Sequence, residues 1–190
     1  MNRNLTLNIV ALAILLFIAR YDLNYLKYKA PMPYSDWDKI TWNDFLGLRK
    51  PYHTIHGEKK IAFISTEIAA EYIGDRTFQI ITYFHPSRSY VFSRNIADKR
   101  LLQHELYHLH ITERFSRLMR QEILMHAGNK TFDLSECLTT YQQQEDSMQR
   151  EYDSDTYHGF LLSKQKLWQI NIDSSLLAMK NFSNTIVKTK

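Results

Sequence analysis

The sequence predicts an α+β fold in which a small antiparallel sheet is followed by two long packed helices, with an apolar segment before them. Three observations support this prediction. Residues 61–84 are rich in the β-branched and aromatic side chains that strands favour, residues 96–126 have a helical period, and residues 5–19 form a terminal apolar run. A chain of 190 residues is long enough for one domain with a hydrophobic core.

The N-terminal segment is apolar from Leu5 to Ala19 and follows a positive charge at Arg3. This pattern is typical of a secretory signal peptide, and the run is short for a membrane-spanning helix of about 20 residues. Phe17 is bulky where cleavage after Ala19 prefers a small residue, so an uncleaved signal anchor is the alternative. We therefore expect residues 1–20 to direct export, to the periplasm or out of the cell, with anchoring at the inner membrane if the segment is uncleaved.

Composition limits the class of protein. The net charge is +4, with Lys and Arg scattered among Asp and Glu, which argues against a nucleic-acid-binding surface. The single cysteine, Cys137, excludes an intramolecular disulfide and a cysteine-rich metal site. Residues 21–39 are expected to be a connector, because Pro31 and Pro33 interrupt regular structure, and the folded domain is expected over 40–185.

The strands are expected first. Residues 61–73 are rich in β-branched and aromatic side chains, Gly74-Asp75 supplies a turn, and residues 77–84 form the next strand. Together they predict an antiparallel hairpin. Pro86 ends it, and a further short strand is expected over 89–92.

The helices follow. Between 96 and 126, apolar side chains recur at helical spacing, and Ala127-Gly128-Asn129 is suited to a C-cap. The apolar residues are Leu101, Leu102, Leu106, Ile111, Phe115, Leu118, Met119 and Ile123. A second long helix is expected over about 138–170, and a last helical piece over 173–180.

The first of these helices contains His104-Glu105-Leu106-Tyr107-His108, which reads H-E-x-x-H. On a helix, residues four apart share a face, so both imidazoles can bind one zinc ion. Glu105 can then act as general base on a metal-bound water. His110 follows His108 by two residues and points to another side of the helix. The alternative is a surface helix with two solvated histidines.

A catalytic zinc needs three protein ligands, and the segment 152–159 is the best source of the third. On a helix continuous through this segment, Tyr152, Asp155 and His158 share a face, and Asp153 falls nearly opposite. We therefore expect His158 as the ligand, then Asp155, then Asp153.

Three further side chains are candidates for supporting roles. Tyr152 and Tyr157 could donate a hydrogen bond to a developing oxyanion, or could be core tyrosines. Glu113 could orient a metal ligand, or could pair with Arg117 one turn later.

Four ordered blocks resemble the bacterial family known as domain of unknown function 922, described as secreted zinc-dependent proteases. The blocks are TWNDFLG at 41–47, YFHPSRSYV at 83–91, LLQHELYH at 101–108 and YDSDTYHG at 152–159. The resemblance spans about 40–168. It implies a zincin-like domain and places Thr156, with Tyr152, beside the metal ligands.

The expected function is zinc-dependent hydrolysis of peptide bonds outside the cytoplasm, with a peptide or protein as substrate, Zn²⁺ as cofactor and Glu105 as general base. Hydrolysis of an amide in cell-wall material would use the same water chemistry. The alternative is a non-catalytic, membrane-tethered domain that binds a metal or a partner. The oligomeric state is left open.

Overall fold

A computed structural model describes residues 28–47, 61–74, 76–92, 98–126 and 132–189. The expected signal segment at 1–20 and the expected C-cap at 127–129 lie outside the described residues. Among the helices that are described, none is long and apolar enough to cross a membrane.

The predicted hairpin is confirmed. Strands β3 (Thr66–Gly74) and β4 (Thr77–Phe84) pair antiparallel, with Ile68 opposite Thr82 and Ala70 opposite Ile80. The other edge of β4 pairs with two short strands, β1 (Met32–Pro33) at one end and β6 (Ile186–Lys188) at the other. Strand β4 is therefore the centre of the sheet, and β3 lies at an edge of it among the described strands.

The expected strand over 61–73 is interrupted. Strand β2 (Ala62–Phe63) pairs instead with β5 (Tyr90–Val91), which confirms the short strand expected over 89–92. The interruption falls at Ser65, whose backbone N–H donates to Oγ of Ser89 and whose carbonyl accepts from the N–H of His85. Because these backbone groups bond to residues of the loop after β4, they take no part in the ladder of hydrogen bonds between strands.

Burial alternates along β4 because successive side chains of a strand point to opposite faces. Phe78, Ile80, Thr82 and Phe84 are buried, and the residues between them are half-buried. The buried face packs against helices, and Ile80 and Phe84 are fully inaccessible to solvent. The main core joins this face of the sheet to the three long helices.

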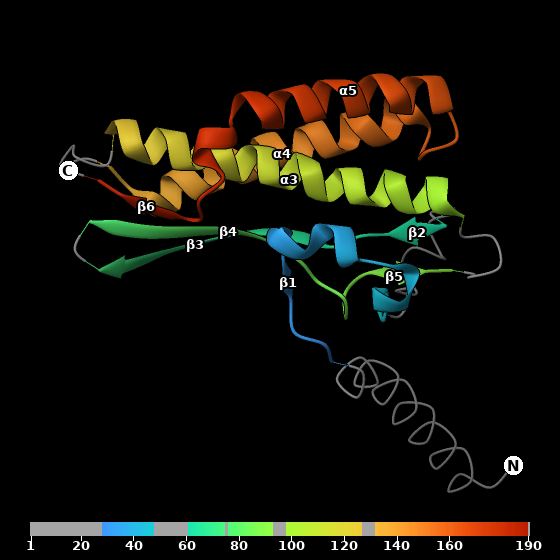
Figure 1. Cartoon of the computed structure of the whole chain (residues 1–190), viewed down its shortest axis with the longest axis horizontal. Helices are drawn as coiled ribbons and strands as arrows, with labels where there is room; N and C mark the ends of the chain where they lie inside the picture. Colours follow the sequence, from blue (N-terminus) through green and yellow to red (C-terminus); the bar gives the residue numbers. More distant parts are fainter. Residues whose placement is uncertain (1–27, 48–60, 75, 93–97, 127–131, 190) are drawn as a thin grey trace, which may run out of the picture.

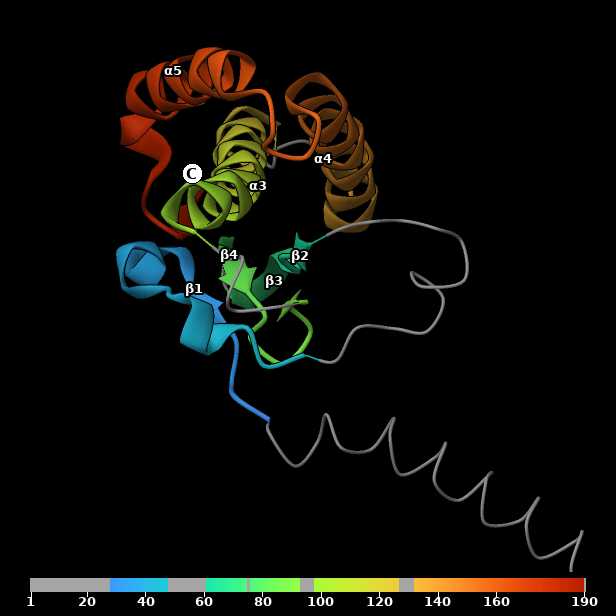
Figure 2. The ribbon, with the colours of Figure 1, turned by 90° about the vertical axis from the view of Figure 1, so that its right-hand side faces the viewer.

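The helices α3 (Lys99–His126), α4 (Leu134–Thr156) and α5 (Leu162–Ala178) all lie on one face of the sheet (Figure 1). Figure 2 shows α3 above the sheet, with α4 on one side of it and α5 on the other. Asp98 and Asp133 accept hydrogen bonds from the first backbone N–H groups of α3 and α4. Three short 3₁₀ helices complete the fold: η1 (Tyr34–Lys39), η2 (Trp42–Asp44) and η3 (Lys180–Phe182).

The expectation of a continuous second helix over 138–170 is wrong, and the fold has three long helices where two were expected. Helix α4 ends at Thr156 because Tyr157, His158 and Gly159 have φ angles of 48°, 53° and 86°. The N–H groups of His158 and Leu161 donate to the carbonyls of Asp153 and Thr156, which closes the helix end. The chain then reverses, and the expected piece over 173–180 is the end of α5 and the start of η3.

The expected boundaries also change. Within the range 21–39, expected to be a connector, Met32 and Pro33 pair with β4, and Tyr34 hydrogen-bonds to α3. Pro33 is tolerated because β1 is a short edge strand, where a missing N–H costs little. At the other end, β6 lies beyond residue 185. The described fold therefore extends from Met32 to Lys188.

Candidate metal centre

Helix α3 presents His104 and His108 on one face, one turn apart. Their Nε2 atoms lie 3.3 Å from each other, and the two residues are 1% and 9% exposed. This convergence follows from the i, i+4 spacing and from packing, because α4 covers this face of α3.

Asp153 of α4 completes the cluster. Its Oδ1 lies 3.2 Å from Nε2 of His104 and 3.0 Å from Nε2 of His108. Tetrahedral zinc with bonds of about 2.0–2.1 Å separates its ligand atoms by about 3.3 Å. The three atoms are therefore spaced like three corners of a zinc tetrahedron, and imidazole and carboxylate are donors that zinc accepts.

The structure differs from the sequence in its choice of third residue. Asp153, expected last, lies with the two histidines, whereas His158 and Asp155 are outside the group. His158 is exposed, and its Nδ1 is 3.3 Å from Oδ1 of Asp153. Asp155 accepts a hydrogen bond from the indole of Trp168. The reason is the end of α4 at Thr156, which removes the continuous helical face assumed for His158.

Gln149 is a functional candidate that the sequence reading missed. Its Nε2 donates to the carbonyl of His108 and to the carboxylate of Glu145. With both amide hydrogens used in this way, Oε1 of Gln149 must accept from Nδ1 of His108. Nδ1 of His108 then carries a hydrogen, so Nε2 can offer a lone pair to a metal.

Polar side chains around Gln149 form a hydrogen-bond network that holds it in place. The hydroxyl of Thr112 lies 2.6 Å from the carboxylate of Glu145 and 2.8 Å from the hydroxyl of Thr66 on β3. Glu145 is buried, and burial raises the pKa of its carboxyl. The network connects the metal-binding face of α3 to both α4 and the sheet.

The signal for this arrangement was present in the sequence. Glu145, Gln149 and Asp153 follow one another at intervals of four residues, so they form a polar stripe on one face of α4. If α4 is taken to end before His158, this stripe indicates Asp153 as the third metal ligand. Recognising it required knowing which face of α4 meets α3.

Tyr152 lies beneath the two histidines as a packing residue. Its ring stacks on His104 at 4.7 Å between centroids and meets the edge of His108 at 4.9 Å. It is fully buried, and its hydroxyl donates to the carbonyl of His104. That geometry favours the core role over oxyanion stabilisation. Tyr157, the other candidate, is 65% exposed and follows the end of α4.

Thr156 and Gly159 shape the turn beside His104. The hydroxyl of Thr156 donates to the carbonyl of Tyr152 and accepts from the N–H of Gly159. A Cβ on Gly159 would lie 3.0 Å from Cγ of His104, closer than ordinary packing allows. The missing side chain thus lets the turn close over the imidazole.

Glu113 lies away from the metal ligands, which differs from the orienting role considered for it. It is buried, and its carboxylate accepts from Arg117, Arg120 and the hydroxyl of Thr82. Arg120 also donates to the carbonyl of Ile80, so this buried network joins α3 to β4. Of the two roles considered for Glu113, the structure has the ion pair with Arg117.

The two histidines differ in their electrostatics. Burial lowers the pKa of His104 to about 4, so this imidazole is neutral at neutral pH. Burial opposes protonation of His108 as well, but the hydrogen bond to Asp153 and the charges of Asp153 and Glu105 outweigh it and raise its pKa. Among the described residues, Nδ1 of His104 has no hydrogen-bond partner, unlike that of His108.

Glu105 is 4% exposed and is close enough for its charge to raise the pKa values of both His108 and Tyr152. A carboxylate next to two imidazoles and a second carboxylate can bind a divalent cation and exchange a proton with a bound water molecule. The arrangement is therefore suited to hydrolytic chemistry.

No family model, no curated protein and no solved structure matches this chain. The resemblance described from the sequence stays a prediction.

Proposed function

We propose that the protein is a zinc-dependent peptidase in which His104, His108 and Asp153 hold the metal ion. The observation that supports this most directly is the spacing of the three ligand atoms, 3.0–3.3 Å from one another. The neutral state of His104 and the hydrogen bond from Nδ1 of His108 to Gln149 both favour metal binding through Nε2. Asp153 replaces His158 as the proposed third ligand.

Zinc, when bound, would supply Lewis-acid activation of a water molecule. Glu105 follows His104 directly on α3 and is proposed as the general base, which takes a proton from that water and passes it to the leaving amine. His158, 3.3 Å from Asp153, is proposed to hold the carboxylate in place through a hydrogen bond. Tyr152 holds both imidazole rings by packing.

The proposed substrate is an extended peptide outside the cytoplasm. Among the described strands, β3 lies at a sheet edge, and α3, which carries the H-E-x-x-H segment, packs against it. An edge strand next to the metal helix can pair with a peptide through backbone hydrogen bonds. With H-E-x-x-H on the adjacent helix, this arrangement supports the proposal of a zincin-like fold.

The test is hydrolysis by the full chain of a mixed library of quenched fluorescent peptides, with zinc content measured in parallel. We expect one zinc per chain, cleavage that a chelator abolishes, and recovery when zinc is added back. A chain that binds zinc and cleaves no library member would argue against the peptidase. A chain that binds no zinc would argue against the metal site itself.

A second candidate function is a non-catalytic metal-binding domain. The observation that favours it is burial, because His104 and Glu105 are 1% and 4% exposed and structural zinc sites are closed. In that case zinc raises the free energy of unfolding and no peptide is cleaved. A catalytic zinc would raise the free energy of unfolding as well, so cleavage in the library assay is the measurement that separates the two functions.

A further inference from the structure

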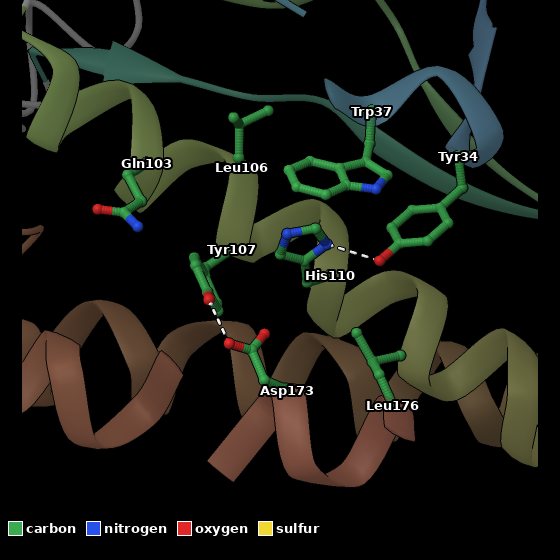
Figure 3. Close-up of a pocket in the computed structure, with 8 residues that line it drawn as sticks. All are labelled: Tyr34, Trp37, Gln103, Leu106, Tyr107, His110, Asp173 and Leu176. Carbon is green, nitrogen blue, oxygen red and sulfur yellow. Dashed lines mark hydrogen bonds between the residues drawn. The ribbon is translucent and has the colours of Figure 1, made fainter. Parts of the chain in front are cut away.

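A second site lies on the opposite face of α3 from the histidine pair. Here η1, α3 and α5 enclose a pocket of about 320 Å³ (Figure 3). Its lining residues are Tyr34, Trp37, Gln103, Leu106, Tyr107, His110, Asp173 and Leu176. The volume is at the low end of small-molecule sites, which span about 300–1,000 Å³. The pocket therefore suits a small ligand or a single side chain.

Hydrogen bonds and ring contacts fix the walls of the pocket. The hydroxyl of Tyr34 is 2.7 Å from Nδ1 of His110, and the hydroxyl of Tyr107 donates to Asp173 at 2.8 Å. The rings of Trp37 and Tyr107 lie across the His110 ring, with centroids 4.6 and 4.8 Å away and steep interplanar angles. Figure 3 shows these side chains converging from all three elements. The walls are therefore already in place without a ligand.

The charge of the pocket is negative. Asp173 is its only carboxylate, and neither Lys nor Arg is among the residues that line it. The nearby guanidinium of Arg117 donates to the carboxylate of Glu113 and to the carbonyl of Leu176, so it already has partners. Oδ2 of Asp173 accepts a hydrogen bond from the hydroxyl of Tyr107, and the residue is exposed, so its carboxylate is accessible from solvent. A cation with N–H donors can therefore reach this carboxylate without breaking a contact inside the protein.

The remaining lining is apolar or aromatic except for the amide side chain of Gln103. Leu106 and Leu176 can cover an alkyl chain, and Trp37, 37% exposed, offers an indole ring to a cation. We propose that this pocket binds a primary alkylammonium group, with its alkyl stem on the leucines and its ammonium on Asp173. The source is either a free alkylamine or the side chain of a lysine in a polypeptide, since both present the same group.

The test is titration of the full chain with n-butylammonium and with 1-butanol, a neutral analogue of nearly equal size. Indole N–H signals of ¹⁵N-labelled tryptophan report binding, and Trp42 and Trp168 serve as internal references outside the pocket. We expect a saturable shift of the Trp37 signal with n-butylammonium and a much weaker response with 1-butanol. Equal responses to the two compounds, or no shift of Trp37, would overturn the proposal.

Asp173→Asn removes the charge and keeps an oxygen that can accept from Tyr107. We expect it to weaken n-butylammonium binding by about two- to fivefold, as the loss of an exposed ion pair does. Asp146→Asn makes the same change in net charge on an exposed position of α4 and should leave binding unchanged. Undiminished binding by Asp173→Asn, or equal losses in both variants, would contradict a role for Asp173.

Nα-acetyl-lysine methylamide then identifies the source of the group. Tighter binding than n-butylammonium assigns a lysine side chain of a polypeptide, and weaker binding assigns a free amine. The titration can be run in the presence of a metal chelator, because the pocket shares no residue with the proposed zinc site. Its result is therefore independent of the proposed peptidase activity.

Discussion

The Oδ1 atom of Asp153 lies 3.0 Å from Nε2 of His108, across the interface between α4 and α3 and 45 residues along the chain. The same oxygen is 3.2 Å from Nε2 of His104. One carboxylate thus joins both histidines of the H-E-x-x-H segment. Its closeness to both histidines distinguishes Asp153 from the other acidic residues near the end of α4.

Asp153→Asn should therefore abolish tight zinc binding. We expect a loss of affinity greater than the 10–100-fold that an outer partner of a ligand is worth, whereas His158→Asn should stay within that range. Asp155→Asn, whose carboxylate bonds to Trp168, is the matched control and should change little. Isothermal titration with zinc measures all three. Retention of zinc by Asp153→Asn together with its loss in His158→Asn would make His158 the ligand.

Glu105→Gln should keep zinc and lose hydrolysis. Removal of a general base lowers the rate by about 10²–10⁴-fold, and glutamine preserves the volume of a residue that is only 4% exposed. Glu122→Gln, near the other end of α3, is the control and should cleave normally. Zinc content and the cleavage rate of one library substrate provide the readout. A Glu105→Gln protein as fast as the wild type would exclude this residue as the base.

Gln149→Ala should lower zinc affinity by about 10–100-fold, because Gln149 accepts the hydrogen bond from Nδ1 of His108 that leaves Nε2 free for the metal. Gln143→Ala changes the same residue type at an exposed position of α4 and should have no effect. Competition with a zinc indicator of known affinity gives both values. Equal affinities in the two variants would remove Gln149 from the site.

Gly159→Ala should distort the site through His104. The new Cβ would lie 3.0 Å from Cγ of His104 at a φ of 86°. Gly74→Ala is the control, since Gly74 also has a positive φ, 124°, but its Cβ would meet nothing within 4 Å. Both variants should lose about 1–2 kcal/mol of unfolding free energy from backbone strain. Only Gly159→Ala should also lose zinc affinity, and a similar loss in Gly74→Ala would contradict the steric explanation.

The metal-free protein should lose stability as the pH falls from about 7 toward 5. Burial lowers the pKa of His110 to about 4, below its usual 6.5, so between these values the unfolded chain binds more protons than the folded one. The contribution of His110 is then about 1–2 kcal/mol of unfolding free energy lost by pH 5. His110→Gln should reduce the pH dependence by that amount in urea unfolding with a chelator present. An unchanged slope would mean that His110 titrates normally in the fold.

Much of the fold could be predicted from local patterns. The β-branched and aromatic residues over 77–84 predicted β4, and the apolar spacing between Leu101 and Ile123 predicted α3, because both are local properties of the sequence. The turn at 157–159 could not be predicted in this way. Tyr157 and His158 adopt left-handed backbone angles that their residue types rarely favour, so the tertiary packing around Gly159 must impose them.

The sequence by itself determined that His104 and His108 share one helical face with Glu105 beside them, since four-residue spacing on a helix requires it. Only the tertiary structure decided which residue meets them. The end of α4 at Thr156 turns His158 outward and leaves Asp153 between the imidazoles. Which residue of α4 faces the histidines depends on the angle at which α4 packs against α3 and on the rotation of α4 about its own axis. Both are set by contacts between residues far apart in the chain.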